Sequence, residues 1–243
     1  MPLVLSKSLV IIPTYNEKDN AERIIRATFE LSEPFDILVV DDGSPDGTAD
    51  IIKRLQDEFP ALHLLEREGK QGLGTAYIAG FRWALERDFE FVFEMDADFS
   101  HNPNDLPRLL AACRDEGADV SVGSRYVKGG KVENWPFIRW AISYFASLFV
   151  RIVLSFGVKD TTAGFKCYRR KVLETIDMDD IWFVGYAFQI EMKYSAHKLG
   201  FKVAEVPITF IDRQYGESKM SMRIFREAFY GVFKLRRKKI KAA

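Results

Sequence analysis

The chain has 243 residues, of which 47% are hydrophobic, and its 35 Lys and Arg residues balance 35 Asp and Glu residues. This length and composition allow one large domain with a sizeable core, and the zero formal charge gives no reason to expect nucleic acid as a partner. Cys113 and Cys167 are far apart and the three histidines are scattered. We therefore expect neither a disulfide framework nor a zinc site, and the two thiols suit a reducing compartment.

The first half of the sequence alternates predicted strands and helices. Short apolar runs rich in β-branched and aromatic residues predict strands over 9–13, 35–40, 61–66, 91–95 and 118–124. Apolar residues at helical spacing predict helices over 21–29, 49–59, 75–87 and 105–115. Asn16 is the expected cap of the first helix. This alternation predicts an α/β fold with a mostly parallel, doubly wound sheet and helices on both of its faces.

The second half is less regular. Its pattern predicts an aromatic-rich helix over 137–155, strands over 161–168 and 202–210, and a helix over 186–199 between those strands. We expect one domain over 1–220 and a basic, amphipathic helix and tail over 221–243.

Two carboxylates follow the fourth strand, where residues 91–101 are FVFEMDADFSH. Side chains two residues apart on an extended chain point the same way, so Asp96 and Asp98 should converge with Ala97 between them. Two such carboxylates repel unless a cation joins them, and hard oxygen ligands suit Mg²⁺ or Mn²⁺. A solvated acidic turn is the alternative, but the end of a central strand is where α/β sheets bind ligands.

The first three strands also end in unusual loops, PTYNE, DDGS and GKQGLG. A G-x-G-x-x-G after the first strand and a G-x-x-x-x-G-K-[ST] are both missing, so neither a nicotinamide cofactor nor a P-loop is expected. Tyr15 is expected to pack on a base or ribose, and Glu17 and Asp42 to accept hydrogen bonds from a nucleotide. Separately, Glu17 could be a first-turn acid of a helix and DDGSPDGT a plain turn. Together with the acidic turn after the fourth strand, these make four such loops at adjacent strand ends, and the combination favours a nucleotide site.

The sequence resembles the polyprenol-phosphate (dolichol-phosphate) mannose synthases of glycosyltransferase family 2. The matching stretches cover almost the whole chain: PTYNE, VVDDGSPDGT, GLGTAYIAGF, MDADFSHNP, GSRY, TTAGFKCYRR, GYAFQIEM and EVPITFIDRQYGESK. The resemblance implies a GT-A (Rossmann-like) fold and transfer of mannose, with inversion, from GDP-mannose to the phosphate of a polyprenyl lipid. The nearest alternative is the same chemistry with UDP-glucose or another hexose donor.

The resemblance also implies roles for particular residues. It implies that the guanosine is held by Pro13, Tyr15, Glu17, Val40 and Asp42. Asp96 and Asp98, with the backbone of Ala97, are expected to hold Mg²⁺ or Mn²⁺ and the diphosphate. The predicted contacts with phosphate groups are Arg125, Arg213 and Lys219, and these three form the predicted catalytic set with Asp98.

The expected acceptor needs no catalytic base. A phosphate monoester is mostly a dianion near pH 7, so the enzyme has to position it and stabilise the departing diphosphate. Arg125 follows a strand end and is expected to receive the lipid phosphate bidentately. His101 is expected either behind the metal or on the surface. Gly216, between Arg213 and Lys219, suggests a loop that closes over the donor; an ordinary solvated loop is the alternative.

Two segments are expected to meet the membrane surface. The aromatic helix around Trp135 to Phe156 has an uncharged run of 11 residues between Arg139 and Arg151, against about 20 for a spanning helix. It is therefore either interfacial or a buried core helix. The tail FKLRRKKIK carries six basic residues in nine, which suits an anionic surface or a solubilising helix end.

No signal peptide is recognisable before the first strand. We therefore expect a peripheral protein on the cytoplasmic face of a membrane: the endoplasmic reticulum in a eukaryote, or the cell membrane in a prokaryote. The sequence leaves open whether separate membrane subunits anchor the chain.

Overall fold

The computed structural model describes residues 7–185, 187–212 and 222–243. A seven-stranded sheet has the order β3-β2-β1-β4-β7-β5-β8, and β6 and β9 form a separate pair. All the strand pairs are parallel except those of β7, which runs antiparallel to β4 and β5. The strands are β1 Ser8–Thr14, β2 Asp36–Asp41, β3 Leu62–Glu66, β4 Phe91–Glu94, β5 Val120–Ser124, β6 Lys131–Glu133, β7 Lys166–Arg169, β8 Val203–Pro207 and β9 Thr209–Ile211.

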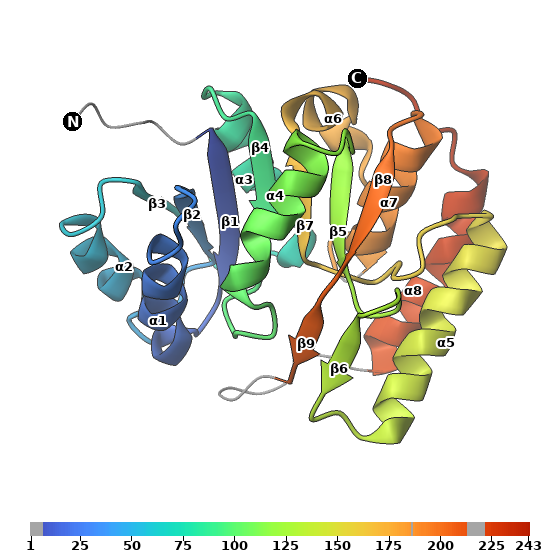
Figure 1. Cartoon of the computed structure of the whole chain (residues 1–243), viewed down its shortest axis with the longest axis horizontal. Coiled ribbons are helices and arrows are strands. Elements are labelled where there is room, and N and C mark those ends of the chain that lie inside the picture. Colours follow the sequence, from blue (N-terminus) through green and yellow to red (C-terminus); the bar gives the residue numbers. More distant parts are fainter. Residues whose placement is uncertain (1–6, 186, 213–221) are drawn as a thin grey trace.

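Helices cover both faces of the large sheet (Figure 1). One hydrophobic cluster joins the sheet to α1, α2 and α4, and a second joins it to α3, α6 and α7. The predicted α/β class and mostly parallel sheet are therefore confirmed. The helices are α1 Lys18–Phe29, α2 Thr48–Gln56, α3 Leu73–Leu85, α4 Leu106–Arg114, α5 Phe137–Leu154, α6 Arg170–Thr175, α7 Ala187–Lys198 and α8 Met222–Arg237, with short 3-10 turns at Pro103–Asp105 and Met178–Asp180.

The central strands are apolar throughout because both of their faces are buried. In β1, Val10 and Ile12 belong to the first cluster, whereas Leu9 and Ile11 belong to the second. Side chains alternate along a strand, so a strand covered on both sides needs a continuous apolar run rather than an alternating one.

Several predicted boundaries were wrong. Glu17, not Asn16, occupies the N-cap position of α1. Asn16 instead has a positive φ of 56°, and its amide donates to Ser44 Oγ. The strand predicted over 161–168 begins only at Lys166, and the one predicted over 202–210 is divided at Ile208 into β8 and β9. Strand β6 was missed because it is short and polar.

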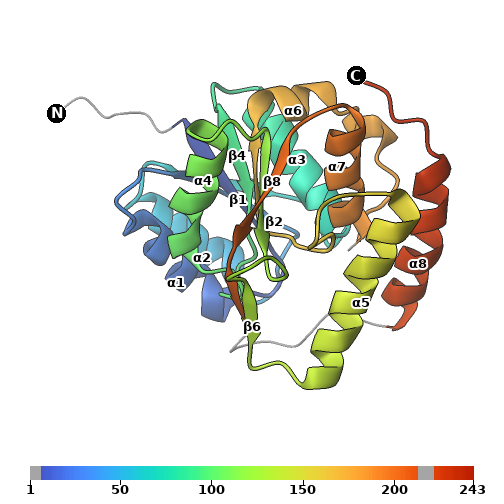
Figure 2. The ribbon, with the colours of Figure 1, turned by 45° about the vertical axis from the view of Figure 1, so that its right-hand side comes forward.

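Helices α5 and α8 lie side by side at one end of the molecule (Figure 2). The rings of Phe149 on α5 and Phe229 on α8 stack with their centroids 4.7 Å apart. Val232 and Leu235 of α8 are buried in the cluster that α5, α7 and α8 share. The C-terminal helix is therefore packed on the rest of the chain.

Helix α5 is not a buried core helix, so that alternative was wrong. Phe137, Ile138, Phe145 and Ile152 are each more than half exposed. Within the described ranges α5 is the one helix long and apolar enough to cross a membrane by length and composition, and 22% of it is buried.

Candidate active site

The four loops singled out in the sequence meet at one edge of the sheet. Strands β3, β2, β1 and β4 are neighbours in that order and run parallel. Their carboxyl ends therefore lie at the same edge, as doubly wound sheets require of a ligand site. We call the loops 13–17, 41–44, 67–71 and 96–101 the carboxylate edge.

Asp41 fixes the backbone of this edge. One of its carboxylate oxygens accepts hydrogen bonds from the hydroxyls of Thr14 at 2.7 Å and Ser44 at 2.6 Å, and the other accepts from the Ser44 amide at 2.8 Å. The Ser44 hydroxyl oxygen accepts in turn from the amide of Asn16. The first acid of DDGS therefore ties the loop after β1 to the loop after β2, and it is buried.

Asp42 holds the loop after β3. Its carboxylate accepts from Arg67 Nε at 2.8 Å and from the amide of Gln71 at 3.2 Å. Gly43 is required between these loops, because its φ is +66° and a Cβ there would lie 2.9 Å from the Gly69 nitrogen. Arg67 was not predicted from the sequence as a site residue. The charged stretch REGK, which begins with it, was the one available indication.

The remaining residues predicted for the nucleotide fall into two groups. Pro13, Tyr15 and Glu17 are half-buried at the edge, and the Lys70 ammonium lies 4.9 Å from the centre of the Tyr15 ring. Val40 has no exposed surface and packs in the core. A direct contact between Val40 and a ligand would therefore require neighbouring side chains to move.

The acidic pair lies in a turn rather than on extended backbone. Strand β4 ends at Glu94, so the prediction that Asp96 and Asp98 alternate along an extended strand was wrong. The turn is held by its own polar groups: Asp98 Oδ1 accepts from the Ser100 amide at 3.0 Å, and the Asp96 amide donates to His101 Nδ1 at 3.2 Å. Phe99, at a φ of 59°, allows the chain to reverse there.

The turn fits a metal whose coordination a ligand completes. The Asp96 side chain is 36% exposed, whereas Asp98 is buried with one oxygen already accepting a hydrogen bond. No group of three or more His, Cys, Asp or Glu residues that could hold a metal occurs in the described part of the chain. Two carboxylates suit Mg²⁺ or Mn²⁺ when phosphate oxygens supply further ligands.

His101 is buried, so its assignment to the surface was wrong. Burial lowers the pKa of His101 to about 4, against the opposing effect of the Asp98 carboxylate. The ring stacks on Phe165 with centroids 4.9 Å apart and meets Phe210 edge-on at 5.6 Å. A neutral imidazole therefore supports the acidic turn from behind and connects it to β9 and to the residue that precedes β7.

Arg125 lies across Phe210 from that turn, with its guanidinium 5.4 Å from the ring centre. The edge of the guanidinium that was predicted to receive a phosphate bidentately is already paired with a carboxylate of the protein. Asp160 accepts from Arg125 Nε at 2.7 Å, from Nη2 at 2.6 Å and from the backbone amide at 2.9 Å. Burial alone would raise the pKa of Asp160, but the guanidinium outweighs this effect and holds the pKa below its usual range. A phosphate would therefore meet the guanidinium away from the edge that Asp160 occupies.

A cavity of about 400 Å³, which we call the Arg125 pocket, opens at this guanidinium. Such a volume lies in the range of small-ligand sites. Nearby, Arg139 Nη1 pairs with Asp212 Oδ2 at 2.5 Å. The pocket is lined by Arg125, Tyr126, Val127, Gly130, Lys131, Val132, Trp140 and Tyr144.

Arg213 and Lys219 lie outside the described residues, but Ile211, just before them, donates its amide to the carbonyl of Ser100 in the acidic turn.

A buried ion pair beneath the acidic turn was missed in the sequence. Lys166 Nζ lies 3.0 Å from Glu94 Oε1, and neither side chain has exposed surface. Tyr168 donates to the same oxygen at 2.9 Å, and Lys166 also donates to Gln189. Burial lowers the pKa of Lys166, and the Glu94 carboxylate opposes that shift. The indication available in the sequence was Lys166 in GFKCY, a charged residue inside an otherwise apolar strand.

The basic tail is only partly a surface feature. Lys238 Nζ lies 2.8 Å from Glu191 Oε1, and its side chain is 3% exposed. The Glu191 carboxylate also accepts from the amides of Trp182 and Phe183. The prediction that all six tail cations face a membrane was therefore wrong for Lys238. The other five, Lys234, Arg236, Arg237, Lys239 and Lys241, are exposed.

Known proteins share both the sequence and the fold. The model of Glycosyl transferase family 2 matches residues 9–177. An undecaprenyl-phosphate mannosyltransferase from Micrococcus luteus is 49% identical over 224 residues, covering 92% of this chain and 91% of the relative. A polyprenol monophosphomannose synthase from Mycolicibacterium smegmatis is 48% identical, covering 93% of this chain and 85% of the relative.

Two solved structures illustrate the fold. A mannosyltransferase from Pyrobaculum calidifontis in complex with GDP-Man and Mn²⁺ has a TM-score of 0.61 at 17% identity, covering 98% of this chain and 66% of that one. A glucosyl-3-phosphoglycerate synthase from Mycobacterium tuberculosis has a TM-score of 0.68 at 17% identity, covering 96% and 80%. The predicted GT-A fold is confirmed. The chain belongs to glycosyl transferase family 2 and, within it, to the polyprenol-phosphate mannose synthases.

Proposed function

We propose that the protein transfers mannose from GDP-mannose to the phosphate of a polyprenyl lipid, releasing GDP and polyprenyl-phosphate mannose. The identity of nearly one half to a mannosyltransferase and a mannose synthase of this kind, over most of the chain, carries this proposal. The choice of GDP-mannose over UDP-glucose is supported by a mannosyltransferase of the same fold that was solved with GDP-Man.

The carboxylate edge is our proposed donor site. Tyr15 and Glu17 are half-buried beside the loops that Asp42 and Arg67 hold in place, and we propose that the nucleoside binds against them. Asp96 and Asp98 would hold a divalent cation, which supplies positive charge to the diphosphate. We keep Pro13, Val40 and the Ala97 backbone as further donor contacts, and contact with Val40 requires the side chains that cover it to move on binding.

Arg125 is our proposed contact for the acceptor phosphate. Because this guanidinium is held by Asp160 and lies near Phe210, it is fixed before the ligand arrives, which lowers the cost of ordering it on binding. Arg213 and Lys219 follow the end of β9 by two and eight residues in the sequence, and we propose that they reach the donor phosphates.

The reaction itself requires positioning rather than proton transfer. A phosphate oxygen of the acceptor forms the new bond to the anomeric carbon as the bond to the GDP oxygen breaks, which inverts that carbon. The dianion needs no base, and the neutral His101, buried behind the turn, is not suited to act as one. Cationic side chains next to the departing diphosphate account for the rate by electrostatic stabilisation.

The membrane-facing surface in this proposal is α5 with α8. Large apolar side chains on both helices are exposed, including Phe145 on α5 and Tyr230 on α8, which are more than 60% exposed. Exposed apolar side chains in such numbers suit an interface with lipid. The Arg125 pocket is lined in part by Trp140 and Tyr144 of α5, so the lipid phosphate would enter beside that helix.

Radiolabelled sugar transfer tests the proposal. We would incubate the protein with a short polyprenyl phosphate and either GDP-mannose or UDP-glucose, with and without a chelator. We expect transfer from GDP-mannose that the chelator abolishes and added Mg²⁺ or Mn²⁺ restores. Transfer from UDP-glucose alone would overturn the assignment of the donor, and chelator-resistant transfer would overturn the assignment of the metal.

A further inference from the structure

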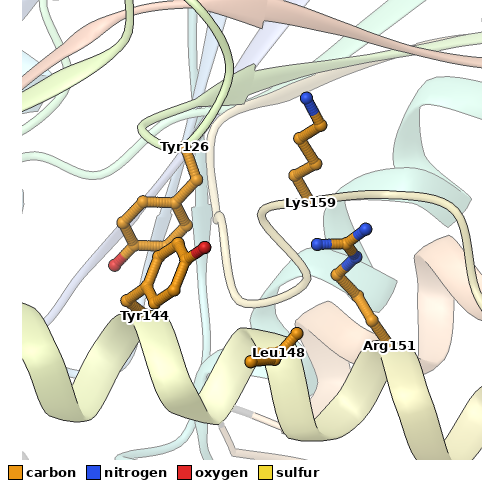
Figure 3. A pocket seen from close by; sticks show the side chains of 5 residues that line it. All are labelled: Tyr126, Tyr144, Leu148, Arg151 and Lys159. Atoms are coloured by element: carbon orange, nitrogen blue, oxygen red, sulfur yellow. The ribbon is translucent and has the colours of Figure 1, made fainter.

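A second cavity lies next to the Arg125 pocket and has no role in the reaction described above (Figure 3). It has a volume of about 150 Å³ and is lined by Tyr126, Tyr144, Leu148, Arg151 and Lys159. The two tyrosines also line the Arg125 pocket, so the cavities are neighbours. We call this smaller cavity the Arg151 pocket.

Arg151 lacks the partner that a buried guanidinium nitrogen normally has. Its Nε is buried and makes no hydrogen bond, and no carboxylate of the described ranges lies within ion-pair distance of the side chain. A buried donor without an acceptor costs stability, more so when the group is charged. An anion held in the cavity by the other guanidinium nitrogens would offset this cost through its charge.

Lys159 adds a second cation, and its loop is fixed. The two oxygens of the Glu205 carboxylate accept the backbone amides of Lys159 at 2.8 Å and Asp160 at 2.9 Å. The Lys159 ammonium pairs with no carboxylate in the described part of the chain, and no acid lines the cavity. Figure 3 shows Arg151 and Lys159 on one side of the cavity, opposite the two tyrosine rings.

The size and the donors of the pocket suit a phosphate group. The cavity is smaller than the roughly 300 Å³ at which drug-sized ligand sites begin, so it accommodates a small group rather than a nucleotide. A guanidinium offers a planar fork of donors that matches phosphate oxygens, and an ammonium adds a point charge.

We propose that the Arg151 pocket binds a phosphate group, either free or as the headgroup of a lipid. A lipid is one source because Arg151 lies on α5, next in the sequence to Ile152, which is 69% exposed. Phosphates of a lipid layer in contact with that apolar face would lie within reach of the pocket. The inference concerns binding only and does not depend on the sugar donor or on turnover.

Inorganic phosphate is the first probe. We would titrate phosphate into the full chain by calorimetry in the presence of GDP and Mg²⁺, which are added to fill the proposed donor site. We expect Arg151→Gln and Lys159→Gln each to weaken the saturable binding by about tenfold, the loss of one charge-assisted interaction. Lys128→Gln is the matched control, because Lys128 is an exposed neighbour that lines neither cavity. It should bind phosphate as the unsubstituted chain does.

Vesicles identify the source of the phosphate. We would compare co-sedimentation with phosphatidylcholine vesicles that contain either phosphatidic acid or uncharged diacylglycerol. A loss of binding to phosphatidic acid in Arg151→Gln, but not in Lys128→Gln, assigns the site to a lipid headgroup. Weakened binding of inorganic phosphate with unchanged vesicle binding assigns it to a free phosphate. If Arg151→Gln and Lys159→Gln bind inorganic phosphate as the unsubstituted chain does, or if no saturable binding occurs, the proposal is wrong.

Discussion

The carboxylate edge and the Arg125 pocket are neighbouring regions built in different ways. At the carboxylate edge, each loop directly follows its own strand, and short-range contacts such as that between Ser44 and Asp41 shape the loops. At the Arg125 pocket, the guanidinium depends on Asp160, 35 residues away along the chain. The loops of the first region are therefore local motifs, although side-chain contacts such as that of Asp42 with Arg67 hold them against one another, whereas the ion pair that fixes the second region joins two distant segments.

One aromatic side chain lies between the two regions. Phe210 of β9 touches His101 behind the acidic turn and lies near the Arg125 guanidinium. Substitutions that separate donor binding from acceptor binding are the most direct test of this division.

The largest expected effect is at the carboxylate edge. Asp98→Ala should lower transfer about a thousandfold, because it removes a metal ligand and with it several kcal/mol of charge stabilisation. The fold should persist, since the hydrogen bond that the side chain accepts from the Ser100 amide lies within the turn itself. Steady-state kinetics at several Mn²⁺ concentrations would measure the loss. Full metal-dependent activity in this variant would contradict the metal assignment.

The next largest effect is expected at the Arg125 pocket. Asp160→Asn leaves the buried Arg125 without its ion-pair partner and should reduce the free energy of unfolding by about 3–5 kcal/mol. In the folded fraction, the KM for polyprenyl phosphate should rise while the affinity for GDP is unchanged. Urea unfolding and GDP calorimetry would measure the two quantities.

Asp179→Asn is the control for Asp160→Asn. Asp179 pairs with Arg82 on the surface, so its loss should cost less than about 1 kcal/mol. An equal loss of GDP affinity and acceptor affinity in Asp160→Asn would show that the two regions are not separable.

His101, which lies where the two regions meet, should make the free energy of unfolding depend on pH. Its pKa in the folded chain is about 4, below the ordinary value of 6.5. Between these pH values the unfolded chain binds a proton that the folded chain does not, so the free energy of unfolding falls as pH falls from 6.5 towards 4. The loss should total roughly 3 kcal/mol. Denaturant unfolding across this range should be less pH-dependent in His101→Gln, and an unchanged slope would argue against a buried neutral ring.

The smallest effect per residue is expected in the basic tail. Replacing Lys234, Arg236, Arg237, Lys239 and Lys241 with Gln should remove the salt-sensitive part of vesicle binding, worth roughly 1 kcal/mol per charge. Exposed charges are screened within about 8 Å at physiological ionic strength, whereas contact through the apolar face of α5 is not weakened by salt. Co-sedimentation against salt would separate the two.

Lys238→Gln provides the contrast for the tail. Because Lys238 is held by Glu191 inside the chain, its loss should lower stability and leave vesicle binding unchanged. If the five-residue variant and the unsubstituted chain bind vesicles equally at low salt, the tail is not an anchor.

Sequence patterns predicted much of the first region because its causes are local. Apolar runs that end in polar turns mark the strands of a parallel sheet, and ligands bind where those strands end. This reasoning located Asp42, Asp96 and Asp98 at one edge. It was wrong about the extended backbone at the acidic pair, because a hydrogen bond from the Ser100 amide to Asp98 and one from the Asp96 amide to His101 turn the chain there.

The sequence by itself determined the α/β order, the strand ends that carry the acids and the apolar character of α5. The tertiary structure alone decided which charges pair: Arg125 with Asp160, Lys166 with Glu94 and Lys238 with Glu191. The physical reason is that periodicity and turn residues act over a few positions, whereas a buried charge needs a partner wherever the fold supplies one. Residues far apart in the chain therefore acquire their partners, and part of their function, only when the elements pack.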